Sequence, residues 1–313
     1  MVDVSVIIVN FNAFEFITKC ITSLREHTKG VTYEIIVVDN CSNEGDILDH
    51  ITEADDLHII KNKVNRGFGA ANNMGSAIAK GRYILFLNND TLFLEDTLSV
   101  LVKYSDESKE AVLLGCKVLN ADMTLQESNF LFPKLQHIFF ESIYLAKLFP
   151  RSEFFNFFAP SYYQGSEPLE TDVVKGCFIF LSSEANKRLK GFDEDFYFYS
   201  EETDLCRRFQ NNIGKVLYYP PTSIIHYGEV STGSYSWFKF RSVAESRIVL
   251  FKKWFTGVRF PLVLISQYLG YIIRGVLNLI AGILTMKKQL ILRGWFFIKM
   301  LFIYPKGRYR IQE

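Results

Sequence analysis

The chain has 313 residues, of which 49% are hydrophobic and 22% are charged, enough for one large domain or for one domain with an appendage. This composition excludes an intrinsically disordered chain, because disorder goes with low hydrophobicity. The formal net charge of +1 is the balance of two segments with opposite charge.

Charge divides the chain near residue 235. Residues 1–235 contain 21 Lys or Arg against 32 Asp or Glu, whereas residues 236–313 contain 14 against 2. The two segments are therefore expected to face different partners. The basic segment is also rich in Phe, Leu and Ile, which favours an anionic lipid surface over a nucleic acid. A basic helix packed onto the core is the alternative.

Cysteine usage and the N-terminus both favour a cytoplasmic protein. The five cysteines are odd in number and widely spaced, with no C-x-x-C pair, so the sequence supports neither a disulfide framework nor a zinc site. The first apolar run is short and follows no basic residues, which argues against a secretory signal peptide.

Three short apolar runs each end in a polar cluster. The runs lie at residues 4–9, 34–38 and 83–87, and the clusters that follow them lie at 10–12, 39–40 and 88–90. Near-continuous apolar runs predict strands buried on both faces, which is typical of a parallel sheet in an α/β fold. Ligands of such folds bind beyond the carboxyl ends of the strands, so the three clusters are expected to meet in one site.

The middle of the chain is expected to carry an aromatic insertion, a further strand and a helix. Residues 130–163 contain twelve Phe or Tyr side chains, which predicts an insertion or lid over residues 130–165. It forms either an aromatic subcore or a surface that faces a second substrate or a membrane. Residues 173–181 are a candidate buried strand, and Ser200 is a candidate N-cap for a helix that ends near Asn211.

The apolar stretch at residues 260–284 is long enough to span a bilayer, but Arg274 lies at its centre. A central Arg costs about 2.5–3.5 kcal/mol on insertion scales, which disfavours a simple span. On a helix the polar side chains of this region fall within a sector of about 120°. This polar stripe comprises Arg259, Ser266, Gln267, Arg274, Asn278, Thr285 and Lys288. The pattern predicts a helix that lies in the membrane interface, with a true span and docking onto the domain as alternatives.

Two common nucleotide-binding motifs are absent. Residues 67–72 lack the third glycine of G-x-G-x-x-G, and no G-K-[ST] occurs, which disfavours dinucleotide oxidoreductases and P-loop NTPases. The polar residues left at predicted strand and helix ends are Asp39, Asp90, the acidic group at 201–204, and His226. Such residues can bind a pyrimidine imide, hold a divalent cation against phosphate oxygens, or act as a general base.

Eight segments follow the order typical of one enzyme family. They are VSVIIVNFN at residues 4–12, VVDNCS at 37–42, NRGFGAANN at 65–73, LFLNND at 85–90, KGC at 175–177, GFDE at 191–194, FYSEETDLC at 198–206 and HYGEVST at 226–232. In these segments the chain resembles glycosyltransferase family 2, inverting enzymes with a GT-A fold, and especially its rhamnosyltransferase-like branch. The resemblance implies a Rossmann-like, mostly parallel sheet in residues 1–235, followed by a helical, membrane-associating segment in residues 236–313.

The resemblance also implies a nucleotide-sugar pocket in which Asp39 reads the base. The other residues implied to line this pocket or to lie near the diphosphate are Asn10, Asn12, Asn40, Asn65, Arg66, Asn72, Asn73 and Asn89. Each has an alternative role, since a strand-end Asn is often only a turn former and a loop Arg can be a solvated charge.

Asp90 closes the family's D-x-D position, which implies a ligand for Mg²⁺ or Mn²⁺ at the donor phosphates. Asn88 and Asn89 stand where carboxylates often occur, so the affinity for metal is expected to be modest and supplemented by His226 and the diphosphate. A His after an apolar strand is usually a core residue, but residues 227–232 match the family's metal-contacting segment.

The family's general base corresponds to Glu202. Glu201 and Asp204 are the other catalytic candidates and are expected to orient the acceptor or the loop, although acids in a first helical turn can merely complement the helix dipole. The residues expected on the acceptor side are Gly176, Cys177 and Asp193.

The expected reaction is one displacement, in which Glu202 takes a proton from the acceptor hydroxyl and the anomeric centre inverts. The branch implies L-rhamnose from dTDP-rhamnose as donor sugar and a lipid-linked or cell-surface glycan as acceptor, at the inner face of the cell membrane. A UDP- or GDP-sugar donor and a non-catalytic glycan- or lipid-binding relative are the alternatives. A sugar-1-phosphate nucleotidyltransferase is disfavoured, because residues 10–13 offer no Gly-rich basic loop.

Overall fold

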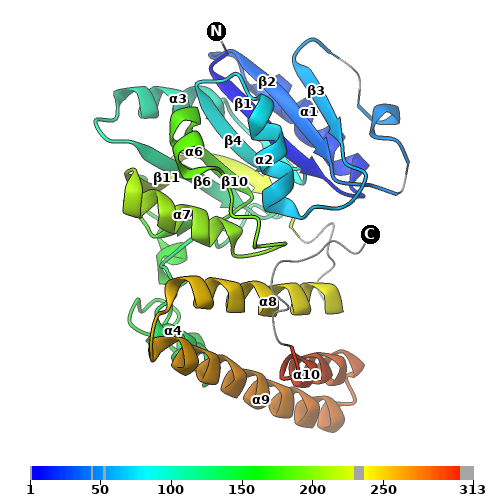
Figure 1. Cartoon of the computed structure of the whole chain (residues 1–313), viewed down its shortest axis with the longest axis vertical. Coiled ribbons are helices and arrows are strands. Elements are labelled where there is room, and N and C mark those ends of the chain that lie inside the picture. Colours follow the sequence, from blue (N-terminus) through cyan, green and yellow to red (C-terminus); the bar gives the residue numbers. More distant parts are fainter. Residues whose placement is uncertain (1, 44, 52–53, 229–235, 304–313) are drawn as a thin grey trace.

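A computed structural model describes residues 2–43, 45–51, 54–228 and 236–303. In this part of the chain, a sheet covered by helices forms one end of the molecule and a layer of helices forms the other (Figure 1). This architecture confirms the predicted α/β fold with a C-terminal helical region.

The main sheet has nine strands among the described residues. In spatial order they are β3 (Leu57–Lys61), β2 (Tyr33–Asp39), β1 (Val4–Asn10), β4 (Tyr83–Asn88), β10 (Phe178–Ser182), β6 (Val112–Leu119), β11 (Lys215–His226) and β5 (Thr91–Phe93), with β8 (Leu169–Glu170) paired to β11. The strands from β3 to β4 are parallel, whereas β10 runs antiparallel to both of its neighbours. The three predicted apolar strands are therefore β2, β1 and β4, side by side.

Helices cover both faces of the sheet, which explains why the strand sequences are almost continuously apolar. Ile8 of β1 packs on the same side as the buried faces of α1 and α3, while Ile7 packs on the other side with α2, α6 and α7. The bounds of these helices are α1 (Phe14–His27), α2 (Phe68–Ile78), α3 (Thr97–Glu107), α6 (Ser183–Leu189) and α7 (Glu201–Asn212), and the short 3₁₀ turns are η1 (Ile47–Asp49) and η2 (Ala159–Tyr162).

The parallel register brings the polar strand ends to one edge of the sheet. Asn10 pairs with Asp39 across β1 and β2, and Val9 pairs with Asn88 across β1 and β4. The clusters at the carboxyl ends of these strands therefore meet, as the sequence predicts.

Residues 173–181 form two strands rather than the single strand predicted. β9 (Val173–Val174) pairs with β7 (Asn129–Phe130) in a separate sheet, and β10 begins only at Phe178. Helix α7 begins after Ser200, as predicted, but Ser200 has a left-handed backbone (φ 67°) and its side chain makes no capping hydrogen bond. The prediction that the helix begins after Ser200 is thus confirmed, whereas the predicted capping by its side chain is wrong.

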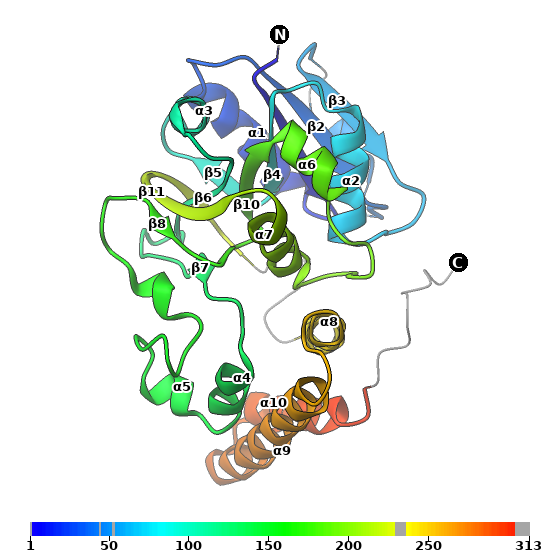
Figure 2. The ribbon, with the colours of Figure 1, turned by 60° about the vertical axis from the view of Figure 1, so that its left-hand side comes forward.

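The helical layer combines the C-terminal segment with part of the aromatic insertion (Figure 2). Its helices are α4 (Leu135–Ser142), α5 (Leu145–Leu148), α8 (Trp237–Trp254), α9 (Arg259–Thr285) and α10 (Lys288–Met300). Helix α9 packs on both α4 and α10. Helix α8 lies between the α9–α10 pair and the sheet (Figures 1 and 2).

The middle of the predicted polar stripe on α9 faces protein, which corresponds to the predicted alternative in which the helix docks onto the domain. Gln267 is buried, and Arg274 donates to the backbone oxygen of Glu141 in α4 at 2.7 Å. The Glu141 carboxylate lies 3.4 Å from Arg274 and 2.6 Å from Arg247 of α8. This partly buried carboxylate provides the counter-charge for both arginines, so α9 docks onto α4 by its polar side.

The opposite face of α9 is apolar and exposed. Ile265, Ile283 and Leu284 are 63%, 68% and 79% exposed. Within the described residues, α9 is the one helix that is long and apolar enough to cross a membrane, with a mean hydropathy of 1.5 over its most apolar window.

The aromatic insertion divides between its two predicted roles. Phe130 and Phe157 are buried in the core beneath α7. Phe155 stacks on Phe149 and meets Phe154 edge-on, and both Phe149 and Phe154 are exposed. The insertion therefore supplies both a subcore and an aromatic surface on the helical layer.

Candidate active site

Asn10 connects the ends of adjacent strands. Its side-chain amide donates to Asp39 Oδ1 at 3.3 Å, and its carbonyl oxygen accepts from the amide of Asn89 at 2.8 Å. Asn10 is fully buried. It therefore positions Asp39 and Asn89, two other predicted site residues, instead of presenting its own amide to a ligand.

Ser42 is a site residue to which the sequence analysis gave no role. Its hydroxyl donates to Asp39 Oδ1 at 2.5 Å and accepts from the backbone N–H of Asn12 at 3.0 Å. Asn12 has a left-handed backbone (φ 50°), and its side-chain oxygen accepts from the N–H of Asn43. Asn12 and Ser42 thus shape the turn that orients the Asp39 carboxylate at the end of β2.

Asn40 organises the loop that leads into α2. Its amide donates to Asn65 Oδ1 at 2.9 Å, and its oxygen accepts from the backbone N–H of Arg66 at 3.0 Å. Gly67 follows with a positive φ of 82°, and a Cβ there would lie 2.2 Å from the carbonyl oxygen of Tyr197. The loop is therefore tightly fixed, and it leaves the Arg66 side chain exposed at the N-terminal end of α2.

Asn72 and Asn73 do not point toward a shared ligand. Asn72 is fully buried and donates to the carbonyl oxygen of Phe68 within its own helix. Asn73 exchanges hydrogen bonds with the backbone of Phe192 and donates to Glu194. Both predicted diphosphate contacts are therefore corrected to packing roles, because their side-chain groups are already engaged by the protein or enclosed within it.

Asp90 and His226 face each other at the ends of neighbouring strands. His226 Nε2 lies 3.3 Å from Asp90 Oδ1, and its Nδ1 lies 2.7 Å from Gln126 Oε1. The same Gln126 oxygen accepts from Lys175 Nζ at 2.7 Å. Since that oxygen can only accept, Nδ1 of His226 carries its proton and Nε2 is the acceptor, which lies 3.2 Å from the amide nitrogen of Asn88 as well as beside Asp90.

This donor set fits a divalent cation. An ionised carboxylate and a neutral imidazole nitrogen are ordinary ligands of such ions, and phosphate oxygens or waters can complete the coordination. Among the described residues no group of three His, Cys, Asp or Glu side chains forms a metal site, so this part of the chain would supply two such ligands, Asp90 and His226. Residues 229–232 of the predicted metal-contacting segment lie outside the described residues.

Gln126 and Lys175 were missed as site residues. Gln126 lies in a loop without a motif, and its amide nitrogen donates to the carbonyl oxygen of His226 at 3.0 Å, which fixes its orientation. Lys175 belongs to a quoted motif, but its sequence position alone gives no sign that it bonds Gln126.

Glu202 lies at the start of α7 beside residue 176. A Cβ on Gly176 would lie 3.5 Å from Glu202 Cβ, so residue 176 lies directly against the stem of the Glu202 side chain. Glu202 is partly exposed, whereas Glu201 is buried with one carboxylate oxygen lacking a hydrogen-bond partner within the described residues.

The electrostatic setting of the two acids favours a proton acceptor. Burial raises the pKa of Glu202, with nearby backbone N–H groups and the Lys175 ammonium acting in the opposite direction. Burial and then the Glu202 charge raise the pKa of Glu201 well above its usual value. Of the two, only Glu202 has an exposed side that a hydroxyl could approach.

Asp204 and Asp193 tie the site to α8. Asp204 is fully buried and accepts from Arg208 (2.7 Å), Lys253 (2.8 Å) and the indole of Trp254 (2.9 Å). Asp193 also pairs with Lys253. The predictions that Asp204 is catalytic and that Asp193 faces the acceptor are therefore corrected, since cations or donors of the protein occupy both carboxylates.

Cys177 is also enclosed by the protein. Its side chain is buried, and burial raises the pKa of its thiol to about 12. Its carbonyl oxygen accepts from the N–H of Asn88 at 3.0 Å. Cys177 thus helps to join β10 to β4 and does not face an acceptor. The acceptor-side role of the neighbouring Gly176 stays a prediction.

Comparison with known proteins identifies the family. The model of glycosyl transferase family 2 matches residues 5–179, more than half of the chain. The chain belongs to this family. It is a glycosyltransferase, and its fold is the GT-A fold implied by the resemblance.

Relatives and solved structures agree with this assignment. Rhamnosyltransferase WbbL of Escherichia coli K12 is 27% identical over 248 residues, which cover 74% of this chain and 86% of WbbL. Glycosyltransferase GlyG of Streptococcus pneumoniae is 31% identical, over 36% of this chain and 38% of GlyG. The fold is shared with GalNAc-T7, solved with UDP, GalNAc and Mn²⁺, at a TM-score of 0.61 and 14% identity, over 89% of this chain and 51% of that chain. TarS 1–349 of Staphylococcus aureus is similar at a TM-score of 0.50 and 15% identity, over 96% of this chain and 81% of that chain.

Proposed function

We propose that this glycosyltransferase moves L-rhamnose from dTDP-L-rhamnose onto a hydroxyl of a lipid-linked or cell-surface glycan, at the inner face of the cell membrane. The observation that carries the donor assignment is the alignment with rhamnosyltransferase WbbL, which covers most of both chains. Other relatives bear other names, such as the poly(ribitol-phosphate) β-N-acetylglucosaminyltransferase TarP of Staphylococcus aureus, and that alignment covers 37% of this chain. A UDP- or GDP-sugar is thus the second candidate donor.

In this proposal the strand ends bind the nucleotide and α7 carries out the proton transfer. Asp39 accepts a hydrogen bond from the imide of the base, and Arg66 contacts the diphosphate from the start of α2. Asp90 and His226 Nε2 would hold Mg²⁺ or Mn²⁺, which when bound would neutralise charge on the departing diphosphate. The arrangement of Gln126 and Lys175 supports this role, because it leaves Nε2 unprotonated, and a cation would replace the amide of Asn88 as its partner.

Glu202 takes the proton of the acceptor hydroxyl as that oxygen forms its bond to the anomeric carbon. The bond to the diphosphate breaks on the opposite side of the sugar, so the configuration inverts in one step. Burial supports this role of Glu202, since a raised pKa makes the carboxylate a stronger base.

The exposed apolar face of α9 supports the membrane location. Since its polar side is bonded to α4, the helix would lie on the bilayer with Ile265, Ile283 and Leu284 in the lipid. Lys287 and Lys288 follow directly and are exposed, where they can contact anionic headgroups.

A panel of dTDP-, UDP- and GDP-sugars tests the donor assignment. We expect dTDP-L-rhamnose with Mn²⁺ to raise the melting temperature most, because binding to the native state stabilises it. We also expect the protein to cleave this donor slowly in water. Preferential stabilisation by a UDP- or GDP-sugar would contradict the rhamnose assignment, and binding without cleavage of any donor would indicate a non-catalytic relative.

A further inference from the structure

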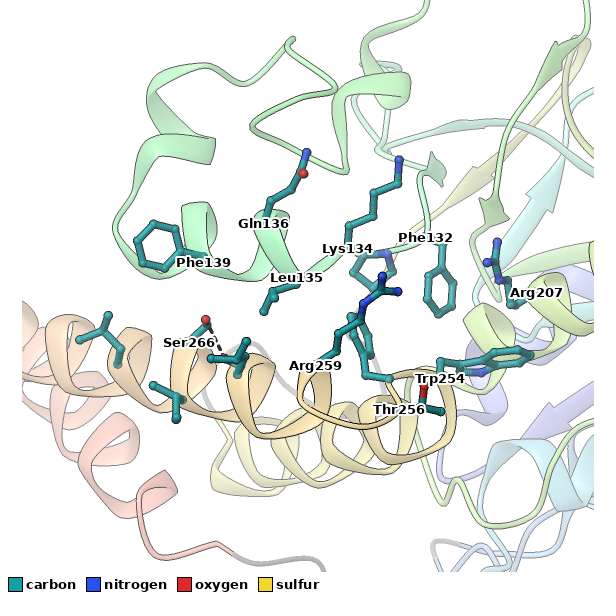
Figure 3. A pocket seen from close by; sticks show the side chains of 15 residues that line it. Phe132, Lys134, Leu135, Gln136, Phe139, Arg207, Trp254, Thr256, Arg259 and Ser266 are labelled. Atoms are coloured by element: carbon teal, nitrogen blue, oxygen red, sulfur yellow. Dashed lines mark hydrogen bonds between the residues drawn. The ribbon is translucent and has the colours of Figure 1, made fainter.

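A cavity of about 820 Å³ lies in the helical layer, away from the strand ends (Figure 3). It is bounded by residues 132–139, by the end of α8 and by α9. Apolar side chains form most of its wall, among them Phe132, Leu135, Trp254, Leu262 and Ile265. Its size is in the range of cavities that bind small organic ligands.

Three cations border this apolar cavity, and no Asp or Glu lines it. They are Lys134, Arg207 and Arg259, none of which forms an ion pair with another described residue. The Arg207 guanidinium lies 4.8 Å from the ring centre of Phe132, and its Nε is buried without a hydrogen-bond partner in the described part of the chain. Figure 3 shows Arg259 reaching from α9 toward Phe132, while the Lys134 side chain extends away from α9. Lys134 and Arg259 are exposed and Arg207 is partly buried, so the cavity offers positive charge without a carboxylate partner beside an apolar wall, which suits a hydrocarbon that carries an anionic group.

The cavity is continuous with the proposed membrane face. Leu262, Ile265 and Leu269 line it, and all three are exposed on α9. A hydrocarbon chain could therefore pass from the lipid into the cavity along one apolar surface.

The cavity is also close to the start of α7. Arg207 follows Glu202 by five residues on this helix, a rise of about 7.5 Å along its axis. The two residues also lie about 140° apart around the axis, so an acceptor held at Arg207 would reach the proposed base around the side of α7.

We propose that this cavity binds the lipid carrier of the acceptor, a hydrocarbon chain that ends in a phosphate or diphosphate. Arg207, Arg259 and Lys134 bind the phosphate, and the apolar wall holds the first part of the chain. This inference rests on the proposed transfer to a lipid-linked glycan. The helical layer would then have two roles: it attaches the enzyme to the membrane, and it selects acceptors by their lipid phosphate.

Titration calorimetry with the full chain and a short-chain prenyl phosphate tests this assignment. We expect the prenyl phosphate to bind, and the matching prenol and inorganic phosphate each to bind at least about tenfold more weakly, because each lacks one half of the interaction. Equal affinity for the prenol, or for a lysophospholipid with a phosphate headgroup, would overturn the assignment to a lipid carrier.

Two pairs of variants separate the cavity from the rest of the layer. Arg259→Gln should weaken prenyl phosphate binding about tenfold or more, whereas Arg293→Gln on α10 should not. Ile265→Asn should also weaken prenyl phosphate binding. Its control is Ile283→Asn, which should not, because Ile283 lies on the same helix with a similar exposure (68% against 63% for Ile265) but outside the cavity. Wild-type affinity in both cavity variants would overturn the proposal.

Nucleotide-sugar binding, measured on the same samples, distinguishes two failures. If the protein binds donor but no prenyl phosphate, the cavity assignment fails and the proposed transfer reaction stands. If it binds no nucleotide-sugar at all, the proposed function fails.

Discussion

Glu201 and Glu202 are neighbours in sequence, but only Glu202 is partly exposed beside Gly176. Glu202→Gln should retain donor binding and lower turnover about 10²–10⁴-fold, because it removes only the proton acceptor. The wild-type rate should also fall on the acidic side at a pH above the usual Glu value of 4.5, since burial raises this pKa and only the ionised form accepts a proton. Steady-state kinetics across pH measure both effects. Wild-type turnover in this variant would move the base to another residue.

Glu201 should act on stability rather than on turnover. Its folded-state pKa is raised by burial and by Glu202, so its favourable contribution is complete below pH 4.5 and is lost as the pH rises through the folded-state value. Gln does not ionise, so Glu201→Gln should not lose this stability as the pH rises. Its free energy of unfolding should therefore rise relative to that of the wild type, by about 1.4 kcal/mol for each unit by which the folded state raises the pKa of Glu201. Urea unfolding at pH 5 and pH 7.5 measures the difference, with the exposed Glu184→Gln as control. Identical pH dependence in wild type and Glu201→Gln would contradict this account.

At the residue scale, the sequence predicts which polar residues lie at the strand ends. It does not predict which of them face a ligand and which only position or pack against other residues. Asp39 and Asp90 could be predicted because parallel strands place their carboxyl ends together, whereas His226 was predicted from the family's motif at residues 226–232. The roles of Gln126 and Ser42 depend on hydrogen bonds between distant segments, and nothing in the local sequence indicates these bonds. The motif at residues 65–73 would look the same whether Asn72 and Asn73 bound the diphosphate or packed within the protein. Only their burial and their hydrogen-bond partners show that they pack.

At the scale of elements, Glu141 holds three helices together. Glu141→Gln would leave Arg247 and Arg274 without their counter-charge, and both guanidinium groups are only 17% exposed. Removing one partner of a fully buried ion pair typically costs about 3–5 kcal/mol, and because Glu141 is 27% exposed, urea unfolding should detect a smaller loss of about 1.5–3 kcal/mol. The matched control is Asp106→Asn, which breaks an exposed pair with Arg82 and should cost less than about 1 kcal/mol. Equal losses in the two variants would contradict the role of Glu141.

The elements themselves were largely predictable, and their pairing was less so. Periodicity in residues 260–284 predicts an amphipathic helix, but it does not say whether the polar stripe meets water, headgroups or a carboxylate on another helix. Glu141 lies 133 positions before Arg274, so their contact depends on the tertiary fold. The region 173–181 was predicted as one strand because its apolar residues continue across a turn at residues 175–177.

At the scale of the whole molecule, the helical layer should bind membranes through α9. Replacing Ile280, Ile283 and Leu284 with Ser should reduce flotation with anionic vesicles more than tenfold, since each exposed side chain would lose about 1.5–3 kcal/mol of burial in lipid. High salt alone should detach the wild type only partly, because salt screens the lysines and not the apolar face. The control replaces Leu48, Ile78 and Met123, which are exposed outside this layer. Equal flotation of the two triple variants would contradict the proposed membrane face.

The measurement that tests the proposed site most directly is calorimetric titration of the donor, with Mn²⁺ and with EDTA, into wild type and Asp90→Asn. If Asp90 and His226 hold a cation at the donor diphosphate, wild type should bind the donor at least about tenfold more tightly with Mn²⁺, since a lost charge-assisted contact costs this much or more. Asp90→Asn should bind it weakly under both conditions. Equal donor affinity in wild type with Mn²⁺ and with EDTA, unchanged by Asp90→Asn, would contradict the account.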